Sequence, residues 1–271
     1  MPYLTLADGL PLYYEQHGSG PNVLLVPGWT ITTRFWERQI NDLANDCCVT
    51  TLDLRGAGNS GKTPDRHSLA AYGDDIAYVI KQLDLEEVTL VAWAMAVSVV
   101  VRLLAYEGCS RVQRFVWVDH SPAFFDAPDW DYALLGDLTP TSLDGILHSL
   151  RHDRIAATRA LITETMFAST LSDSEVEWMV AEALKTPTEV AVQMLAAVAN
   201  ADLRPLLPRL RLPVLVINGN EIAVPPDVGG WLEANLPNAR AVRLEGAGHA
   251  PFWDAPAAFN SAVREFIALG R

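Results

Sequence analysis

The sequence predicts an α/β protein with a mostly parallel sheet that helices cover on both faces. Short β-branched or apolar runs alternate with longer amphipathic segments along most of the chain. A strand buried on both faces of a parallel sheet is a nearly continuous apolar run, and the connection to the next strand is usually a helix. The runs that fit this description are residues 23–26, 49–52, 88–91, 115–118 and 214–217.

The two ends of the chain complete the predicted sheet. Residues 3–6 and 10–15 read as an antiparallel hairpin with a turn at Asp8-Gly9, because Asp-Gly favours tight hairpin turns. Residues 241–244 are expected to form a final strand, and residues 255–269 a closing helix. An antiparallel hairpin therefore leads into the parallel sheet.

The alternation of strand-like apolar runs with helical segments stops near residue 123 and resumes near residue 205. Helical runs are expected at about 142–167 and 188–199, and Ser172 with Glu175 forms a capping-box pattern that opens a helix through Leu184. We therefore expect a core of residues 1–122 and 205–271, with a helical cap at 123–204 over the site.

Composition narrows the function classes. The chain has 271 residues, 50% hydrophobic, with 33 acidic against 20 basic residues and a net charge of −13. Such a surface repels nucleic acid and anionic lipid, so neither is an expected partner, and no oligomeric state is indicated. Three cysteines form no disulfide or metal pattern. With no signal peptide or membrane span evident, we expect a cytoplasmic protein.

A small-residue turn follows the predicted strand at 88–91 and opens a helical run. Ala92, Ala94 and Ala96 occupy the three defined positions of the G-x-S-x-G pattern, in which a sharp strand-to-helix turn presents a nucleophilic serine. Ala94 occupies the position at which the pattern has its nucleophilic serine. A hydroxyl is needed to form an acyl-enzyme, so the chain as written cannot carry out serine hydrolysis.

Two further turns and a loop that contains a histidine also follow predicted strands. Pro27-Gly28-Trp29 follows the first parallel strand, where a glycine turn can direct a backbone N–H to a reacting atom. Gly56-x-Gly58-x-x-Gly61 formally matches a dinucleotide fingerprint, but it follows the second parallel strand and Pro64 interrupts any helix. His249 lies in a glycine loop after the final strand. Together these motifs resemble the α/β-hydrolase fold over the whole chain.

The histidine base of that fold needs an acidic partner to orient it. At the usual position, after the next-to-last strand, this chain has Ile222, with Glu221 beside it as a weaker substitute. The alternative position follows the preceding strand, and there the chain has Asp119. We therefore predict that His249 and Asp119 are catalytic. The N–H groups of Trp29 and Met95 are the predicted oxyanion donors.

The sequence also resembles the cofactor-independent 2,4-dioxygenases of 3-hydroxy-4(1H)-quinolones, which share this fold. Their Pro-Gly-Trp turn matches Pro27-Gly28-Trp29, their base matches His249, and their displaced acid matches Asp119. The resemblance implies that the base deprotonates the substrate 3-hydroxyl and that the anion reacts directly with O₂. A peroxide at C2 closes on the C4 carbonyl, and carbon monoxide leaves to give an N-acylanthranilate. No metal or other cofactor is implied.

This chain departs from the family at the elbow. Family members have His-Ser-His-Gly-Gly there, whereas this chain has Trp93-Ala94-Met95-Ala96-Val97. Trp29 and Trp93 are expected to form an apolar wall for a flat ring, and Ala94 and Met95 are the other residues expected to contact O₂ or substrate. The cap is rich in apolar residues, which favours a 2-alkyl quinolone as substrate. The apolar residues in question are Leu135, Ile146, Leu150, Ile162, Met166 and Phe167.

Three other functions remain open from the sequence. One is an esterase or C–C hydrolase whose nucleophile has been replaced by Ala94. Against a single engineered change, both flanking glycines are also absent and Ile222 occupies the usual acid position. The second is a non-catalytic protein that binds a small hydrophobic ligand. The third, a dehydrogenase, rests only on the glycines near residue 58.

Overall fold

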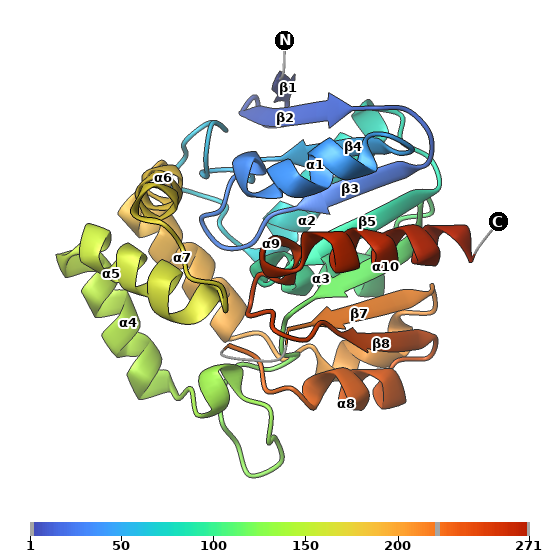
Figure 1. The fold of residues 1–271 in the computed structure, drawn as a ribbon. Coiled ribbons are helices and arrows are strands. Elements are labelled where there is room, and N and C mark those ends of the chain that lie inside the picture. The colour runs from blue at the N-terminus through green and yellow to red at the C-terminus, as the bar shows by residue number, and fades with distance from the viewer. Residues whose placement is uncertain (1–2, 220–222, 270–271) are drawn as a thin grey trace.

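The strands form one eight-stranded sheet (Figure 1). The computed structural model describes residues 3–219 and 223–269. The spatial order is β1-β2-β4-β3-β5-β6-β7-β8, in which β3 to β8 run parallel and the first two strands antiparallel. The strands are β1 (Tyr3–Thr5), β2 (Pro11–His17), β3 (Asn22–Val26), β4 (Cys48–Leu52), β5 (Val88–Trp93), β6 (Val112–Val118), β7 (Val214–Asn218) and β8 (Ala239–Arg243).

Alternate side chains of the parallel strands enter two separate cores. In β3, Leu24 and Val26 belong to one hydrophobic cluster, whereas Val23 and Leu25 belong to the other. This alternation is the consequence of side chains pointing to opposite faces of a strand. The predicted α/β class with a doubly covered parallel sheet is confirmed, as is the antiparallel N-terminal hairpin.

Helices cover both faces of the sheet. The first core receives side chains of α2, α3 and α8, and the second receives those of α1 and α10, which cross the front of the sheet in Figure 1. The helices of the sheet layer are α1 (Glu37–Leu43), α2 (Leu69–Gln82), α3 (Met95–Tyr106), α8 (Val228–Asn235), α9 (Pro251–Asp254) and α10 (Pro256–Ala268), with 3₁₀ turns at Thr33–Trp36 and Arg204–Arg209. Among the described residues, no helix combines the length and apolarity needed to cross a bilayer.

Between β6 and β7 the chain leaves the sheet and forms a helical layer beyond the ends of the strands (Figure 1). This layer contains α4 (Pro140–His152), α5 (Arg154–Leu161), a π-helical turn (Ile162–Met166), α6 (Asp173–Ala183) and α7 (Thr188–Ala199). The capping box of Ser172 and Glu175 is present. The helical run expected at 142–167 is interrupted: Asp153 has φ −144° and ψ 80°, and its side chain caps the new helix at Ala156.

Three smaller differences concern boundaries. β8 begins at Ala239 and ends at Arg243, one residue short of the predicted end. The closing helix expected at 255–269 is α10, which begins at Pro256 because Ala255 is non-helical, and the short helix α9 precedes it. The glycine segment near residue 58 does not open a helix, since α2 starts only at Leu69, so the dinucleotide fingerprint lacks its structural context.

Candidate active site

The turn between β5 and α3 has the backbone of a nucleophile elbow. Ala94 lies between the end of the strand and the first helical residue, Met95, with φ 51° and ψ −121°. Positive φ is strained for a residue with a side chain, and the sharp turn holds it there. The Ala94 N–H donates to the carbonyl of Val118 at 3.1 Å, which ties the elbow to β6. The methyl group of Ala94 therefore stands where this fold presents a serine hydroxyl.

The Pro27-Gly28-Trp29 turn packs directly against the elbow. A Cβ added to Gly28 would lie 3.2 Å from the Trp93 carbonyl oxygen and 3.3 Å from the Ala94 Cβ. Glycine allows this close approach of the two turns. The Trp29 indole N–H donates to the Ala191 carbonyl of α7 at 2.7 Å, so its ring joins the core to the helical layer.

The two predicted oxyanion donors belong to the Pro27-Gly28-Trp29 turn and to the elbow. The Trp29 and Met95 N–H groups make no hydrogen bond to other described residues. Met95 is also the first residue of α3, where helix N–H groups lack intrahelical partners. Both groups are thus able to stabilise an anionic oxygen.

Asp119 follows β6 directly and is almost fully buried. One carboxylate oxygen, Oδ1, accepts the Gly219 N–H at 2.9 Å and the Asn218 amide at 3.4 Å. The other, Oδ2, lies 2.6 Å from His249 Nδ1. With Nδ1–H donating to this carboxylate, His249 Nε2 keeps its lone pair and can accept a proton. The structure thus places the two predicted catalytic side chains in contact, although 130 positions separate them.

Hydrogen bonds to the core and to the helical layer hold the His249 loop. The Trp93 indole donates to the His249 carbonyl at 2.7 Å, and the two rings lie 5.4 Å apart. The next residue, Ala250, donates its N–H to the Met166 carbonyl of the helical layer at 2.9 Å. Asp254 accepts N–H groups from Gly248 and from residues 168 and 169. The base is therefore anchored to the core and to the layer above it.

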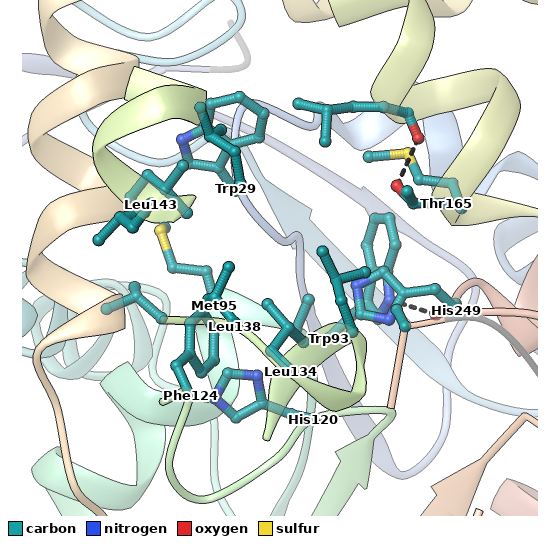
Figure 2. Close-up of a pocket in the computed structure, with 18 of the residues that line it drawn as sticks. Trp29, Trp93, Met95, His120, Phe124, Leu134, Leu138, Leu143, Thr165 and His249 are labelled. Carbon is teal, nitrogen blue, oxygen red and sulfur yellow. Dashed lines mark hydrogen bonds between the residues drawn. The ribbon is translucent and has the colours of Figure 1, made fainter. Parts of the chain in front are cut away.

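A mostly apolar cavity lies between the sheet and the helical layer (Figure 2). Its wall includes all four predicted binding residues, Trp29, Trp93, Ala94 and Met95, together with His249. Among the lining residues that the structure describes, three besides the tryptophans have polar side chains, and the Thr165 hydroxyl already donates to the Leu161 carbonyl at 2.7 Å. The remaining lining residues are Ile31, His120, Phe124, Leu134, Leu135, Leu138, Leu143, Ile146, Leu161, Met166, Leu195, Val198 and Ala223.

Some predicted placements differ from the structure. Leu135, Ile146 and Met166 line the cavity as expected, but the other three cap residues singled out do not. Ile162 and Phe167 pack into the second core instead, and Leu150 is buried one turn beyond Ile146. Glu221 and Ile222 lie outside the described residues. Within the described ranges, no group of three or more His, Cys, Asp or Glu side chains could hold a metal ion.

Sequence reasoning missed His120. Its ring is 1% exposed, lines the cavity and contacts the Ser98 hydroxyl through Nε2 at 2.8 Å. Burial, with a smaller effect of nearby His249, lowers the pKa of His120 from 6.5 to about 3. The ring is therefore neutral at physiological pH. A polar residue directly after the predicted acid was the signal available in the sequence.

We expect His120 to make the folded protein sensitive to mild acid. The unfolded chain takes up a proton near pH 6.5 but the folded chain only near pH 3, so stability falls as pH decreases through that window. Between pH 7 and 5 the loss is about 2 kcal/mol of unfolding free energy. Urea unfolding at both pH values should show a smaller loss in His120→Gln. The exposed control His152→Ala should behave as wild type; equal losses in all three proteins would contradict the assignment.

Comparisons with known proteins agree on the family. The sequence profile of the alpha/beta hydrolase fold matches residues 21–256. A pimeloyl-[acyl-carrier protein] methyl ester esterase from Nitrosomonas europaea is 26% identical over 92% of this chain and 97% of that protein. The parallel sheet, the elbow at Ala94 and the histidine loop at His249 are the features of an α/β-hydrolase-fold protein. The chain belongs to the alpha/beta hydrolase fold family.

Solved structures show the same architecture. An esterase from Exiguobacterium antarcticum superimposes with a TM-score of 0.92 at 23% identity, covering 98% of both chains. A bromoperoxidase from Bacillus anthracis gives a TM-score of 0.89 at 25% identity, covering 96% of both. These likenesses establish the arrangement of the sheet and helices.

Proposed function

We propose that this chain is an enzyme in which the His249–Asp119 pair acts as a general base on a hydrophobic heteroaromatic substrate. The specific reaction proposed is cofactor-free cleavage of a 2-alkyl-3-hydroxy-4(1H)-quinolone by O₂. One observation carries the proposal: His249, hydrogen-bonded to the buried Asp119, lines an apolar cavity whose elbow residue, Ala94, has no nucleophile. A base without a nucleophile supports deprotonation rather than acyl-enzyme chemistry.

In the proposed reaction, His249 Nε2 takes the proton of the 3-hydroxyl, and the imidazolium is stabilised by Asp119. The electron-rich anion transfers electrons to O₂, and a C2–O bond forms to give a peroxide. The terminal peroxide oxygen adds to the C4 carbonyl. Cleavage of the O–O bond and of the two ring bonds to C3 releases that carbon as carbon monoxide. The proton held by His249 then leaves to water, so that substrate and O₂ are fully accounted for in the N-acylanthranilate anion, this proton and carbon monoxide.

The aliphatic part of the cavity wall supports an alkyl-bearing substrate. Leu143 and Ile146 of α4, with Leu195 and Val198 of α7, contribute only aliphatic surface. Figure 2 shows Leu143 and Trp29 together, away from His249. Burial of each methylene group of a tail against such surface contributes about 0.8 kcal/mol. We therefore propose that this wall holds the 2-alkyl group.

A second candidate is hydrolysis of an ester or C–C bond by a protein whose nucleophile is lost at Ala94. The relatives named above include two esterases, and they favour hydrolase chemistry over ring-cleaving dioxygenation. The apolar cavity would also accept an acyl chain. This candidate requires a serine at position 94, which the chain lacks.

One assay separates the candidates. Metal-free protein is mixed with 2-heptyl-3-hydroxy-4(1H)-quinolone in air-saturated buffer, and O₂ uptake and carbon monoxide release are followed. We expect equal amounts of both, with slower turnover of the 2-methyl analogue because it leaves the aliphatic wall unfilled. In parallel, Ala94→Ser is assayed with p-nitrophenyl esters of several chain lengths.

The outcomes are distinct. Absence of quinolone cleavage, together with ester hydrolysis by Ala94→Ser, would support the hydrolase candidate and exclude the dioxygenase. Saturable binding of the quinolone without turnover by either protein would indicate a non-catalytic binding protein.

A further inference from the structure

We propose that His120 is a second substrate-contacting residue, whose Nδ1–H donates a hydrogen bond to a ring carbonyl oxygen of the ligand. The inference rests on the proposed heteroaromatic substrate and adds the chemical group that the site recognises beside the acidic hydroxyl. Three observations carry it: the position of the ring on the cavity wall, its fixed orientation and the hydrogen bonding of its other nitrogen.

The His120 ring is held rigidly at the cavity wall. It lies 5.1 Å from the Phe124 ring in an edge-to-face contact and 6.1 Å from the Trp117 ring. The His120 carbonyl accepts the Trp117 indole N–H at 2.8 Å, which holds the backbone. Figure 2 shows the ring at the cavity wall near Leu134 and Phe124, apart from His249. A ligand between the walls would meet two separate imidazoles.

The Ser98 hydroxyl determines which His120 nitrogen carries the proton. Among the described residues, the only hydrogen-bond partner of this buried hydroxyl is His120 Nε2, at 2.8 Å. If Nε2 were protonated, the hydroxyl proton would have no acceptor, which is costly for a buried group. The arrangement that uses every proton has Ser98 donating to Nε2. The neutral ring then carries its proton on Nδ1.

The Nδ1–H group is left for a ligand. Nδ1 has no hydrogen bond to a described residue, and it is not among the fully enclosed unpaired atoms of the described chain. The cavity is the space that this side chain borders. Because burial keeps the pKa of His120 near 3, the ring neither takes up a proton nor competes with His249 as the base.

The neutral His120 Nδ1–H can only donate, so it pairs with a hydrogen-bond acceptor of the ligand. The acceptor that we propose is a ring carbonyl oxygen. In the proposed reaction this oxygen is that of C4. When the peroxide oxygen adds to C4, the carbonyl π electrons move onto the oxygen, and the hydrogen bond strengthens as negative charge develops there. His249 thus handles the hydroxyl, and His120 handles the neighbouring carbonyl.

The test measures binding without turnover. Two unreactive probes share the ring system and the tail: 2-heptyl-4(1H)-quinolone has the carbonyl, and 2-heptylquinoline lacks it. Titration calorimetry is performed with wild type, His120→Leu, His120→Gln and the double variant His120→Leu/Ser98→Ala. The double variant removes both partners of the buried bond, so it retains the site if His120→Leu alone is poorly folded.

We expect both leucine-containing variants to bind the quinolone about tenfold more weakly while binding the quinoline as wild type does. Glutamine, whose amide can donate, should restore part of the difference. Equal weakening for both probes, or no weakening, would overturn the proposal, as would failure of wild type to bind the quinolone. If carbonyl-selective binding depends on His120 but no ring cleavage occurs, the inference stands and the proposed reaction fails.

Discussion

Replacement of His249 by alanine is expected to lower kcat for quinolone cleavage by about 10²–10⁴-fold, the range that general bases usually contribute. The variant keeps the apolar walls but has no nitrogen to accept the 3-hydroxyl proton. Binding of the unreactive 2-heptyl-4(1H)-quinolone should therefore change little. The loss should appear in kcat rather than in the dissociation constant of this probe.

The pH profile provides an independent readout for this variant. Substrate that ionises in solution no longer needs the enzyme base, so activity of His249→Ala should recover as pH rises toward the pKa of the substrate hydroxyl. The exposed His152 supplies a matched control, and His152→Ala should retain wild-type rates. Unchanged activity of His249→Ala near neutral pH would remove it as the base.

The second large effect is expected for Asp119→Asn. The carboxylate accepts hydrogen bonds on both oxygens, from His249 Nδ1 on one side and from Gly219 on the other. An amide has one oxygen and one NH₂ group, so one of these donors must face the NH₂. If it is His249, the proton moves to Nε2 and the base loses the lone pair that faces the substrate. We expect kcat to fall by about 10²–10⁴-fold.

The measurement for Asp119→Asn combines kcat with binding of the same unreactive quinolone. Because Asp119 is behind His249 and does not line the cavity, the dissociation constant should stay within about twofold of wild type. Asp126→Asn, an exposed change in the following loop, is the matched control. A kcat reduction no larger than that of the control would show that Asp119 does not orient the base.

The architecture was largely predictable because its signals are local. Apolar runs such as residues 23–26 and 214–217 mark strands buried on both faces, and Asp8-Gly9 marks the hairpin. The break at Asp153 was not predictable from helical periodicity, since that residue continues the polar pattern of the helix surface. Its side chain instead caps the next helix at Ala156.

Placement of the cap side chains also needed the three-dimensional structure. Ile146 and Leu150 share one helical face in sequence, yet the cavity contacts only the turn that contains Ile146. Hydrophobic periodicity identifies a buried face but not which neighbour covers it. The same limit concealed His120, whose role depends on Ser98 in a different element.

The amino-acid sequence by itself determined the fold class and the absence of a nucleophile at Ala94, because periodicity and residue chemistry are properties of the chain alone. Only the tertiary structure decided that Asp119 lies 2.6 Å from His249, that the cavity is apolar, and that Ser98 directs the second imidazole. These are distances between side chains far apart in sequence. They are set by packing of the sheet and helices, which no local pattern records.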